Sequence, residues 1–225
     1  MRILLAGNGK MASEVAKLCL EKGIVCSRFG TDAIPSRTPH TVAIHFGSGR
    51  ELATLIKLCE ERHHPLIQGS TKVEVPVGHK MIIVNAPNLA IPMIALMRAF
   101  PAFAKDLTQL GGMDLCIAES HQSKKTDVSG TARAVAKEMG MSESGITPIR
   151  NPAIQMALGV PEENLGGHAY HYFAFTGHGV KISVNTEILG RRAYAEGALL
   201  LAKALLQKHL ALGTHDLSKV VQQLF

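Results

Sequence analysis

The stretch RILLAGNGKMASEV, residues 2–15, decides the fold of this 225-residue chain. An apolar run ends in the glycine turn GNG at 7–9, and a helical pattern follows at once, with Met11 and Val15 on one face. Gly23 stands where a glycine commonly follows the last turn of a helix. The stretch therefore predicts a strand, a tight turn and a helix, which is the opening unit of a parallel sheet.

The segments that follow keep alternating between strand and helix. The pattern predicts four further strands and one further helix, the strands at 24–27, 41–46, 65–68 and 81–84 and the helix at 50–62. Each strand is apolar at nearly every position, as strands are when helices cover both faces of a parallel sheet. The first part of the chain is therefore predicted to be an α/β fold of the Rossmann type.

Beyond residue 88 the pattern has an α+β character. It predicts helices at 89–104 and 129–139 and strands at 114–118, 168–175 and 180–188. The last two strands flank the turn TGHG at 176–179, which is typical of an antiparallel hairpin. A final long helix is predicted at about 192–209.

Composition narrows the classes of function. Apolar residues make up 46% of the chain and charged residues 19%, as in globular proteins. The net charge of +6 is compatible with nucleic acid, but the basic residues are scattered and aromatic residues are only 4%. A small polyanion such as a dinucleotide or a dicarboxylate suits this charge equally well, so the charge alone does not decide. No apolar run is long enough for a membrane span and no signal-peptide pattern is present, so a soluble cytoplasmic protein is expected. The cysteines lack metal-site or CxxC spacing and are predicted to be reduced core residues, namely Cys19, Cys26, Cys59 and Cys116.

The glycine turn fits the dinucleotide motif G-x-G-x-x-A. Gly7 and Gly9 follow the first strand and Ala12 lies in the helix, so the backbone can approach a pyrophosphate at the helix N-terminus. Arg28, after the second strand, fits the 2′-phosphate of NADP and slightly favours that cofactor, with a surface arginine as an alternative of nearly equal weight. The only acid nearby is Asp32, so NADPH and NADH both remain open as cofactors.

The stretch ESHQSKKTDVSGTA, residues 119–132, concentrates polar groups just before a predicted helix. His121 can supply a proton and Lys125 a positive charge, with a structural histidine and a solvated lysine as the alternatives. The run Ser129-Gly130-Thr131 offers amides and hydroxyls to an anion at the helix N-terminus. Ser129 or Thr131 as a simple N-cap is the plainer alternative, and it is compatible with anion binding.

This stretch resembles the signature of the dihydrodipicolinate reductase family, E-x-H-H-x-x-K-x-D-x-P-S-G-T-A. The matching residues are Glu119, His121, Lys125, Asp127, Ser129, Gly130, Thr131 and Ala132. The similarity covers nearly the whole chain. It includes the segments GNGKMA, AIHFGSG, QGST, APNLAIP, GGHAY and GRRAYAEGALLLAKAL.

The resemblance implies hydride transfer from NADPH or NADH that reduces 4-hydroxy-tetrahydrodipicolinate to tetrahydrodipicolinate, in lysine and diaminopimelate biosynthesis. It implies that His121 and Lys125 are catalytic and that Ser129, Gly130 and Thr131 bind the carboxylate of a small dicarboxylate substrate. Gly7, Gly9, Lys10 and Met11 lie under the cofactor pyrophosphate by the same resemblance. The other residues that it assigns to the cofactor are Gly47, Gly69, Ser70 and Thr71 beside the nicotinamide and Asn88 at the domain hinge. No metal is expected.

Two domains are predicted on this basis. Residues 1–88 with 191–225 are expected to form the dinucleotide-binding Rossmann domain, and residues 89–190 the substrate-binding and oligomerisation domain. The open mixed sheet of the second domain is expected to pair with other subunits, because an uncovered sheet needs a partner. The resemblance implies a homotetramer.

Several positions depart from the family pattern. Gln122 replaces the second histidine, the proline before Ser129 is missing, His45 replaces an aspartate and Gly167 replaces an acid. The segment VPEEN at 160–164 is acidic where the family has a basic loop. Two alternatives therefore stay open, a divergent NAD(P)H-dependent reductase of another small anionic imine or carbonyl and a non-catalytic dinucleotide sensor. A sensor has no need of His121 and Lys125.

Overall fold

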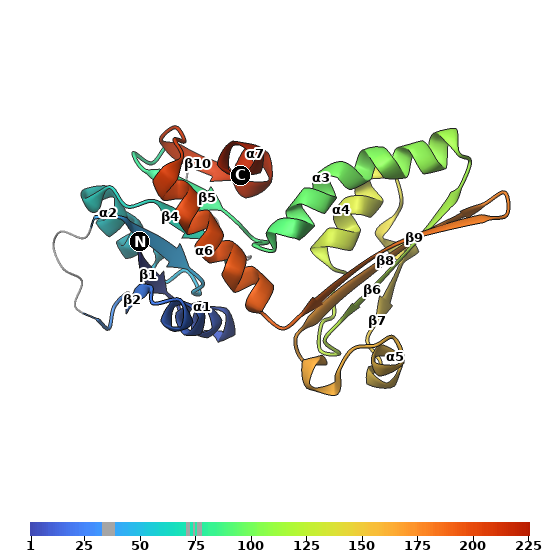
Figure 1. Ribbon diagram of the computed structural model, residues 1–225, viewed down its shortest axis with the longest axis horizontal. Helices are drawn as coiled ribbons and strands as arrows, with labels where there is room; N and C mark the ends of the chain where they lie inside the picture. Colours follow the sequence, from blue (N-terminus) through green and yellow to red (C-terminus); the bar gives the residue numbers. More distant parts are fainter. Residues whose placement is uncertain (33–38, 71–72, 74, 76–77) are drawn as a thin grey trace. The chain divides into compact units, whose positions relative to one another are not determined.

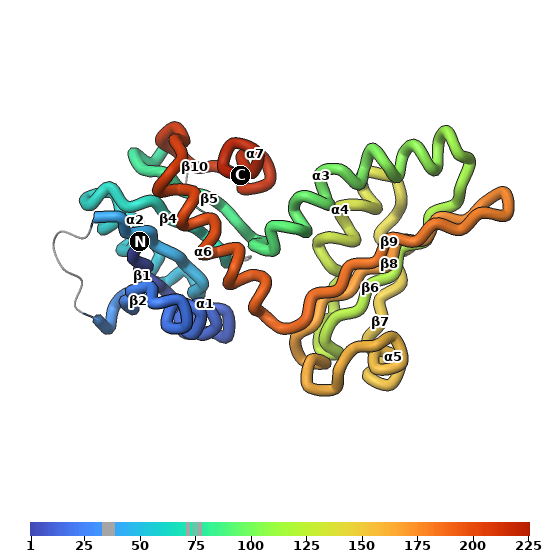
Figure 2. Tube along the Cα trace, viewed as in Figure 1, coloured from blue at the N-terminus to red at the C-terminus, as the bar shows by residue number. Residues whose placement is uncertain are grey.

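The computed structural model of the protein describes residues 1–32, 39–70, 73, 75 and 78–225. These residues form two compact units, one of residues 1–91 with 191–225 and the other of residues 92–190. Figure 1 labels the helices and strands, and Figure 2 follows the chain as it leaves the first unit and returns to it for the C-terminal segment.

The first unit is built on a six-stranded sheet in the order β10-β5-β4-β3-β1-β2, with every neighbouring pair parallel. Its strands are β1 (Arg2–Ala6), β2 (Val25–Arg28), β3 (Thr41–His45), β4 (Leu66–Gln68), β5 (Ile82–Asn85) and β10 (Gly213–Asp216). Its helices are α1 (Lys10–Glu21), α2 (Leu52–Arg62), α6 (Arg192–Gln207) and α7 (Leu217–Leu224). The predicted α/β fold of the Rossmann type is confirmed.

Helices cover both faces of this sheet. On one face, Leu4, Ala43 and Leu66 of neighbouring strands pack against Leu55 and Cys59 of α2. The opposite face lies against α1 and α6, which also contact each other. All five residues of β3 are buried, which explains the nearly continuous apolar runs of the central strands.

The sequence pattern does not predict two elements of this unit, β10 and α7. The helix predicted at 192–209 ends at Gln207, and β10 then adds a parallel edge strand beside β5. The sequence of β10 is GTHD, without a large apolar residue, because an edge strand is covered less completely than a central one. Hydrophobic periodicity therefore gives no signal for it.

The second unit holds a four-stranded mixed sheet in the order β7-β6-β8-β9. Its strands are β6 (Asp114–His121), β7 (Ile146–Ile149), β8 (His168–Gly177) and β9 (Val180–Leu189). Its helices are α3 (Ile91–Lys105), which starts at the last residue of the first unit, α4 (Gly130–Glu138) and α5 (Pro152–Ala157), with short π and 3₁₀ turns at Asp106–Leu110, Glu143–Gly145 and Glu162–Asn164. β6 and β7 are parallel, whereas β6–β8 and β8–β9 are antiparallel. The predicted α+β unit with a mixed sheet is confirmed.

One face of the mixed sheet packs against α3 and α4. Phe100 of α3 and Phe173 of β8 have ring centroids 4.6 Å apart, and Val135 of α4 belongs to the same core. The opposite face is open at Cys116, which is exposed. The prediction that all four cysteines lie in the core is therefore wrong for Cys116, and Cys26 is only half-buried. The reason is the alternation of β6, which turns Cys116 away from the face that the helices cover.

The hairpin between β8 and β9 is confirmed. The turn residues His178 and Gly179 have φ values of 52° and 76°, and the strands on either side pair from Gly177 and Val180 onward. Two consecutive positive φ values define a type I′ turn, whose twist suits a two-residue hairpin.

Gly7 is expected to be far less replaceable than Gly9. A Cβ on Gly7 would lie 2.7 Å from the backbone carbonyl carbon of Phe46, and Gly7 has φ +107°, whereas a Cβ on Gly9 meets nothing within 4 Å. Gly7→Ala should lower the free energy of unfolding by about 1–3 kcal/mol or more, and Gly9→Ala by less than about 1 kcal/mol. Urea unfolding of the two variants beside the parent chain measures this. Equal losses would contradict the close approach of the backbone.

Candidate active site

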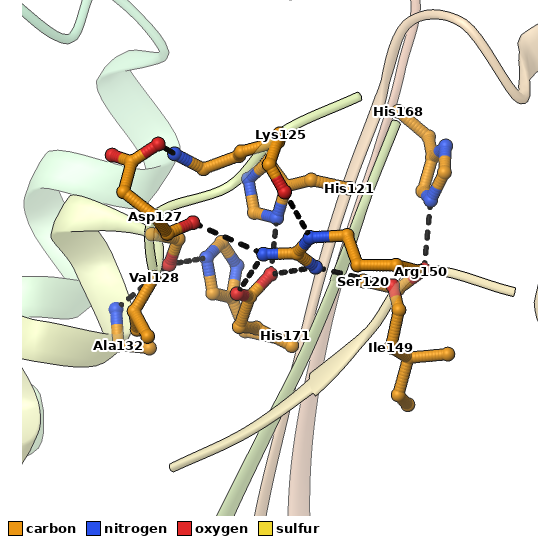
Figure 3. A network of polar contacts seen from close by, with 12 residues as sticks. Ser120, His121, Lys125, Asp127, Val128, Ala132, Ile149, Arg150, His168 and His171 are labelled. Atoms are coloured by element: carbon orange, nitrogen blue, oxygen red, sulfur yellow. Dashed lines mark hydrogen bonds and ion pairs between the residues drawn. The ribbon is translucent and has the colours of Figure 1, made fainter. Parts of the chain in front are cut away.

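The C-terminal end of β6 places Glu119 and His121 side by side. The pattern predicts a strand only to Ala118, but β6 continues to His121 because it pairs with β8 along its whole length. Residues i and i+2 of a strand share a face, and Glu119 Oε2 lies 2.5 Å from His121 Nδ1. Figure 3 shows the ring turned toward the polar network. The carboxylate therefore holds a proton on Nδ1 and leaves Nε2 for proton exchange.

Arg150, directly after β7, is the second charged partner of the Glu119 carboxylate. Its Nη1 and Nη2 donate to the two carboxylate oxygens at 3.0 and 2.5 Å. Its other hydrogen bonds go to the backbone carbonyls of Ile149 (3.1 Å), Lys125 (2.9 Å) and Asp127 (3.2 Å). Figure 3 shows the guanidinium at the centre of this network. A guanidinium has five N–H donors, so each one of Arg150 has an acceptor.

Glu119 is fully buried and still ionised. Burial raises the pKa of its carboxyl, but the hydrogen bonds and charges of His121 and Arg150 outweigh this and hold the pKa at about 2. A buried charge persists only when it is paired and hydrogen-bonded in this way. The carboxylate is therefore a fixed negative charge beneath the imidazole at every pH near neutrality.

Lys125 lies on the loop between β6 and α4, and Arg150 holds the backbone of this loop. Lys125 Nζ is 2.7 Å from Asp127 Oδ1, and the lysine side chain is 20% exposed against 65% for the aspartate. The hydrogen bond from Lys125 lowers the pKa of Asp127, so this partner is a carboxylate at the surface. A substrate carboxylate can take the place of such an exposed partner at little cost.

The start of α4 divides its donors between protein and solvent. Ser129 is the N-cap, because its Oγ accepts a hydrogen bond from the amide of Ala132 at 3.0 Å, which confirms the capping interpretation. Ser129 Oγ also lies 2.9 Å from His171 Nε2, in the interior. The Ser129 hydroxyl is therefore occupied by the Ala132 amide and the His171 imidazole. The amides of Gly130 and Thr131, which bond to no other residue in the part of the chain that the structure describes, are left for an anion.

Two buried histidines of β8 support this arrangement. Burial, aided by the positive charge of His121, lowers the pKa of His171 to about 4, so its ring is neutral. His171 Nδ1 lies 3.0 Å from Thr186 Oγ1 and its Nε2 lies 2.9 Å from Ser129 Oγ, so each ring nitrogen has a hydroxyl partner. His168 Nε2 lies 2.8 Å from Ser120 Oγ, on the opposite face of β6. Both rings act as packed hydrogen-bonding groups of the interior.

The glycine turn of the first unit keeps the N-terminus of α1 open. Gly9 is the N-cap, has no side-chain cap and has free space around it. Lys10 and Met11 therefore begin the helix with uncapped amides, the arrangement that binds a pyrophosphate. Arg28 Nη1 donates to the carbonyl of Gly7 at 2.8 Å, so the end of β2 is tied to the turn.

Other predicted cofactor residues gather at the carboxyl ends of β3 and β4. Ser70 Oγ donates to the carbonyl of Gly47 at 2.7 Å. A Cβ on Gly69 would lie 2.3 Å from the Phe46 ring, so any larger residue there would displace the ring. Asn88 Oδ1 accepts from the amide of Ala90 at 3.0 Å and forms a local turn three residues before the unit ends. Thr71 lies outside the described residues.

His45 is fully buried beneath these loops. Its Nδ1 lies 2.7 Å from Gln68 Oε1, and its Nε2 lies 3.4 Å from Glu51 Oε1. Gln68 Oε1 also accepts from the amide of Ser70 at 3.3 Å. The replacement of aspartate by His45 therefore keeps a polar group that links the loop after β3 to the loop after β4.

The predicted site residues thus form two groups, one in each unit. Within the described ranges, no cluster of His, Cys, Asp and Glu is suited to a metal ion, and no helix combines the length and the apolar character that crossing a membrane requires. Sequence reasoning missed four residues of the second group, namely Glu119 as a partner of His121, Arg150, Gln155 and His171. The spacing E-x-H within a strand is the one signal that identifies Glu119 in advance.

The first unit has a parallel sheet covered by helices, with a glycine turn after its first strand, and the second unit has a mixed sheet. This combination defines a two-unit protein of the Rossmann class. The profile of the family described as "Dihydrodipicolinate reductase, C-terminus" matches residues 93–221, more than half of the chain. The chain belongs to the dihydrodipicolinate reductase family.

Named relatives agree with this assignment. The chain is 36% identical over 137 residues to 4-hydroxy-tetrahydrodipicolinate reductase 1, chloroplastic, of Arabidopsis thaliana, covering 55% of this chain and 40% of that protein. The chain thus matches less than half the length of this plant relative. It is 26% identical over 239 residues to 4-hydroxy-tetrahydrodipicolinate reductase of Alkaliphilus oremlandii, covering 95% and 96% of the two chains. The fold matches dipicolinate-bound dihydrodipicolinate reductase from Paenisporosarcina sp. TG-14 with a TM-score of 0.67 at 16% identity, covering 98% and 99%.

Acid is expected to destabilise the second unit through Glu119. Its pKa in the folded chain, about 2, lies below the ordinary 4.5, so its stabilisation is complete above pH 4.5 and is lost as the pH falls toward 2. The loss is on the order of 3 kcal/mol. Hydrogen exchange of β6 and β8 between pH 5 and pH 2 measures it. Glu119→Gln should reduce this dependence of stability on pH, whereas the control Glu143→Gln, at an exposed ion pair, should leave it unchanged. An unchanged pH dependence in Glu119→Gln would contradict the role of Glu119 in the acid sensitivity.

Ser129→Ala should destabilise α4 by about 1 kcal/mol, because it removes the N-cap and leaves Nε2 of the buried, neutral His171 without its hydrogen-bond partner. Ser129→Thr, which keeps the hydroxyl, should restore most of the loss. Urea unfolding of the three chains gives the result. Equal stability of Ser129→Ala and the parent chain would show that the hydroxyl is free for another role.

Proposed function

We propose that this chain is an NADPH- or NADH-dependent reductase that converts 4-hydroxy-tetrahydrodipicolinate to tetrahydrodipicolinate in lysine and diaminopimelate biosynthesis. The observation that carries the proposal is the ionised, buried Glu119 at 2.5 Å from His121 Nδ1, on a strand whose following loop bears Lys125. Family membership supports the same reaction, as does the full-length similarity to a bacterial 4-hydroxy-tetrahydrodipicolinate reductase.

The first unit fits a dinucleotide. The space around Gly9 and the uncapped start of α1 suit a pyrophosphate, so Gly7, Gly9, Lys10 and Met11 would hold it. Arg28, tied to the Gly7 carbonyl, would face the ribose that distinguishes NADPH from NADH. Gly47, Gly69, Ser70 and Thr71 are proposed for the nicotinamide end, and Asn88 for the domain hinge. The bound cofactor supplies the hydride.

The second unit handles the substrate and its proton. Glu119 fixes His121 with Nδ1 as the donor to the carboxylate, and His121 Nε2 exchanges the proton with the substrate. A substrate carboxylate replaces Asp127 as the ion-pair partner of Lys125. The amides of Gly130 and Thr131, at the start of α4, donate hydrogen bonds to the same carboxylate. Ser129 contributes by shaping this helix start. The relative from Paenisporosarcina binds dipicolinate, a ring with two carboxylates, which is the substrate class that this set of donors suits.

A homo-oligomer, with a tetramer as the proposed state, covers the open face of the mixed sheet. Support comes from β9, a ten-residue edge strand with exposed residues at alternate positions. Uncovered strand edges and faces of this length favour pairing with another copy.

The reaction is tested by a coupled assay of purified protein with pyruvate, aspartate semialdehyde, the upstream synthase and NADPH or NADH. Oxidation of the cofactor that depends on the synthase is expected. His121→Ala should lower kcat by about 10²–10⁴-fold, since it removes the proton donor. Lys125→Ala should raise KM and lower kcat, because a substrate carboxylate loses its positive partner.

Lys124→Ala is the matched control, because Lys124 is exposed one position away, and it should leave both constants unchanged. Absence of synthase-dependent oxidation with either cofactor, together with measurable cofactor binding, would overturn the proposed reaction. It would favour a divergent reductase or a dinucleotide sensor.

A further inference from the structure

We infer that Arg150 is a positioning residue for proton transfer, which holds the Glu119 carboxylate and the backbone of the Lys125 loop in one fixed arrangement around His121. The inference rests on the proposed function and assigns this role to a residue outside the predicted catalytic set. Arg150 is expected to act through Glu119 and Lys125 and not to touch the substrate.

The guanidinium joins three separate segments. It donates hydrogen bonds to both carboxylate oxygens of Glu119 on β6 and to the backbone carbonyls of Lys125 and Asp127 on the loop after β6. Its own strand contributes the carbonyl of Ile149. Only a planar group with five donors makes all these bonds at once, and a lysine ammonium in the same place has three.

The residues after Arg150 extend the same support to His121. Gln155 is fully buried on α5, and its Nε2 lies 2.7 Å from the carbonyl of His121 and 2.9 Å from that of Ile149. Asn151 Oδ1 accepts from the amide of Ala153 at 2.9 Å and starts the helix that carries Gln155. The segment 149–155 therefore fixes the backbone of both His121 and Lys125.

Arg133 offers a comparison within the same unit. It forms a similar fork with Glu143, at 2.9 and 3.0 Å, but both side chains are about half exposed. Exposed ion pairs of this kind contribute little to the free energy of unfolding. The difference between the two forks is that Glu119 is buried and bonded to His121, so a shift of its carboxylate moves the imidazole.

The test uses Arg150→Lys in the full chain, with Arg133→Lys as the matched control. A displacement of about 1 Å costs about 100-fold in rate, so kcat of Arg150→Lys should fall by about 100-fold, with the dissociation constant of NADPH unchanged. In the His121→Ala background the same substitution should cost clearly less than about 100-fold, because the part of its effect that acts through the imidazole is already lost and only the part through the Lys125 loop remains. Arg133→Lys should match the parent chain.

A second measurement does not depend on activity. The titration of the Glu119 carboxyl is followed by ¹³C NMR in the full chain. Its pKa, about 2 in the parent chain, should be higher in Arg150→Lys and unchanged in Arg133→Lys. A kcat loss of Arg150→Lys that persists in full in the His121→Ala background, or an unchanged titration of Glu119, would overturn the positioning role. If the parent chain turns over no substrate, the proposed function fails, and the titration alone still decides whether Arg150 governs Glu119.

Discussion

The buried ion pair between Glu119 and Arg150 is the constraint on which the second unit depends. A carboxylate without exposure needs full compensation, and Glu119 obtains it from a bidentate guanidinium and from an imidazole. Because Arg150 donates two further hydrogen bonds to the loop after β6, at the carbonyls of Lys125 and Asp127, the same pair that neutralises Glu119 also sets the path of the chain through Lys125. The same guanidinium therefore neutralises the buried carboxylate and fixes the conformation of the loop.

The first unit is governed by a steric constraint instead. The chain after β1 runs so close to the end of β3 that a Cβ on Gly7 would collide with Phe46, whereas a Cβ on Gly9, at the start of α1, would meet nothing within 4 Å. Arg28 and Ser70 then tie the turn and the neighbouring loops together through backbone carbonyls. The carboxyl ends of β1 and β3 therefore lie beside a helix start with uncapped amides, which is the arrangement that suits an anionic cofactor.

Much of this was accessible from sequence because it is local. Apolar periodicity predicts the strands of the parallel sheet, and the dipeptide His178-Gly179 predicts the hairpin. The role of Arg150 is not accessible, because it lies 31 residues from Glu119 and reaches it through β7, whose sequence ITPI contains a proline and gives no clear strand pattern. The commitment of Ser129 to His171 depends likewise on a contact across 42 residues. Such long-range polar contacts leave no periodic signal.

The most direct test of the account is the ¹⁵N NMR spectrum of the imidazoles in the parent chain at neutral pH, with His121 assigned from its loss in His121→Gln. A buried carboxylate at 2.5 Å requires a proton on Nδ1 of His121, whereas the neutral His171 should show one protonated and one unprotonated nitrogen. A protonated Nδ1 on His121, protected from exchange with water, is the predicted result. An unprotonated Nδ1 on His121 would contradict the claim that Glu119 and Arg150 prepare this histidine for proton transfer.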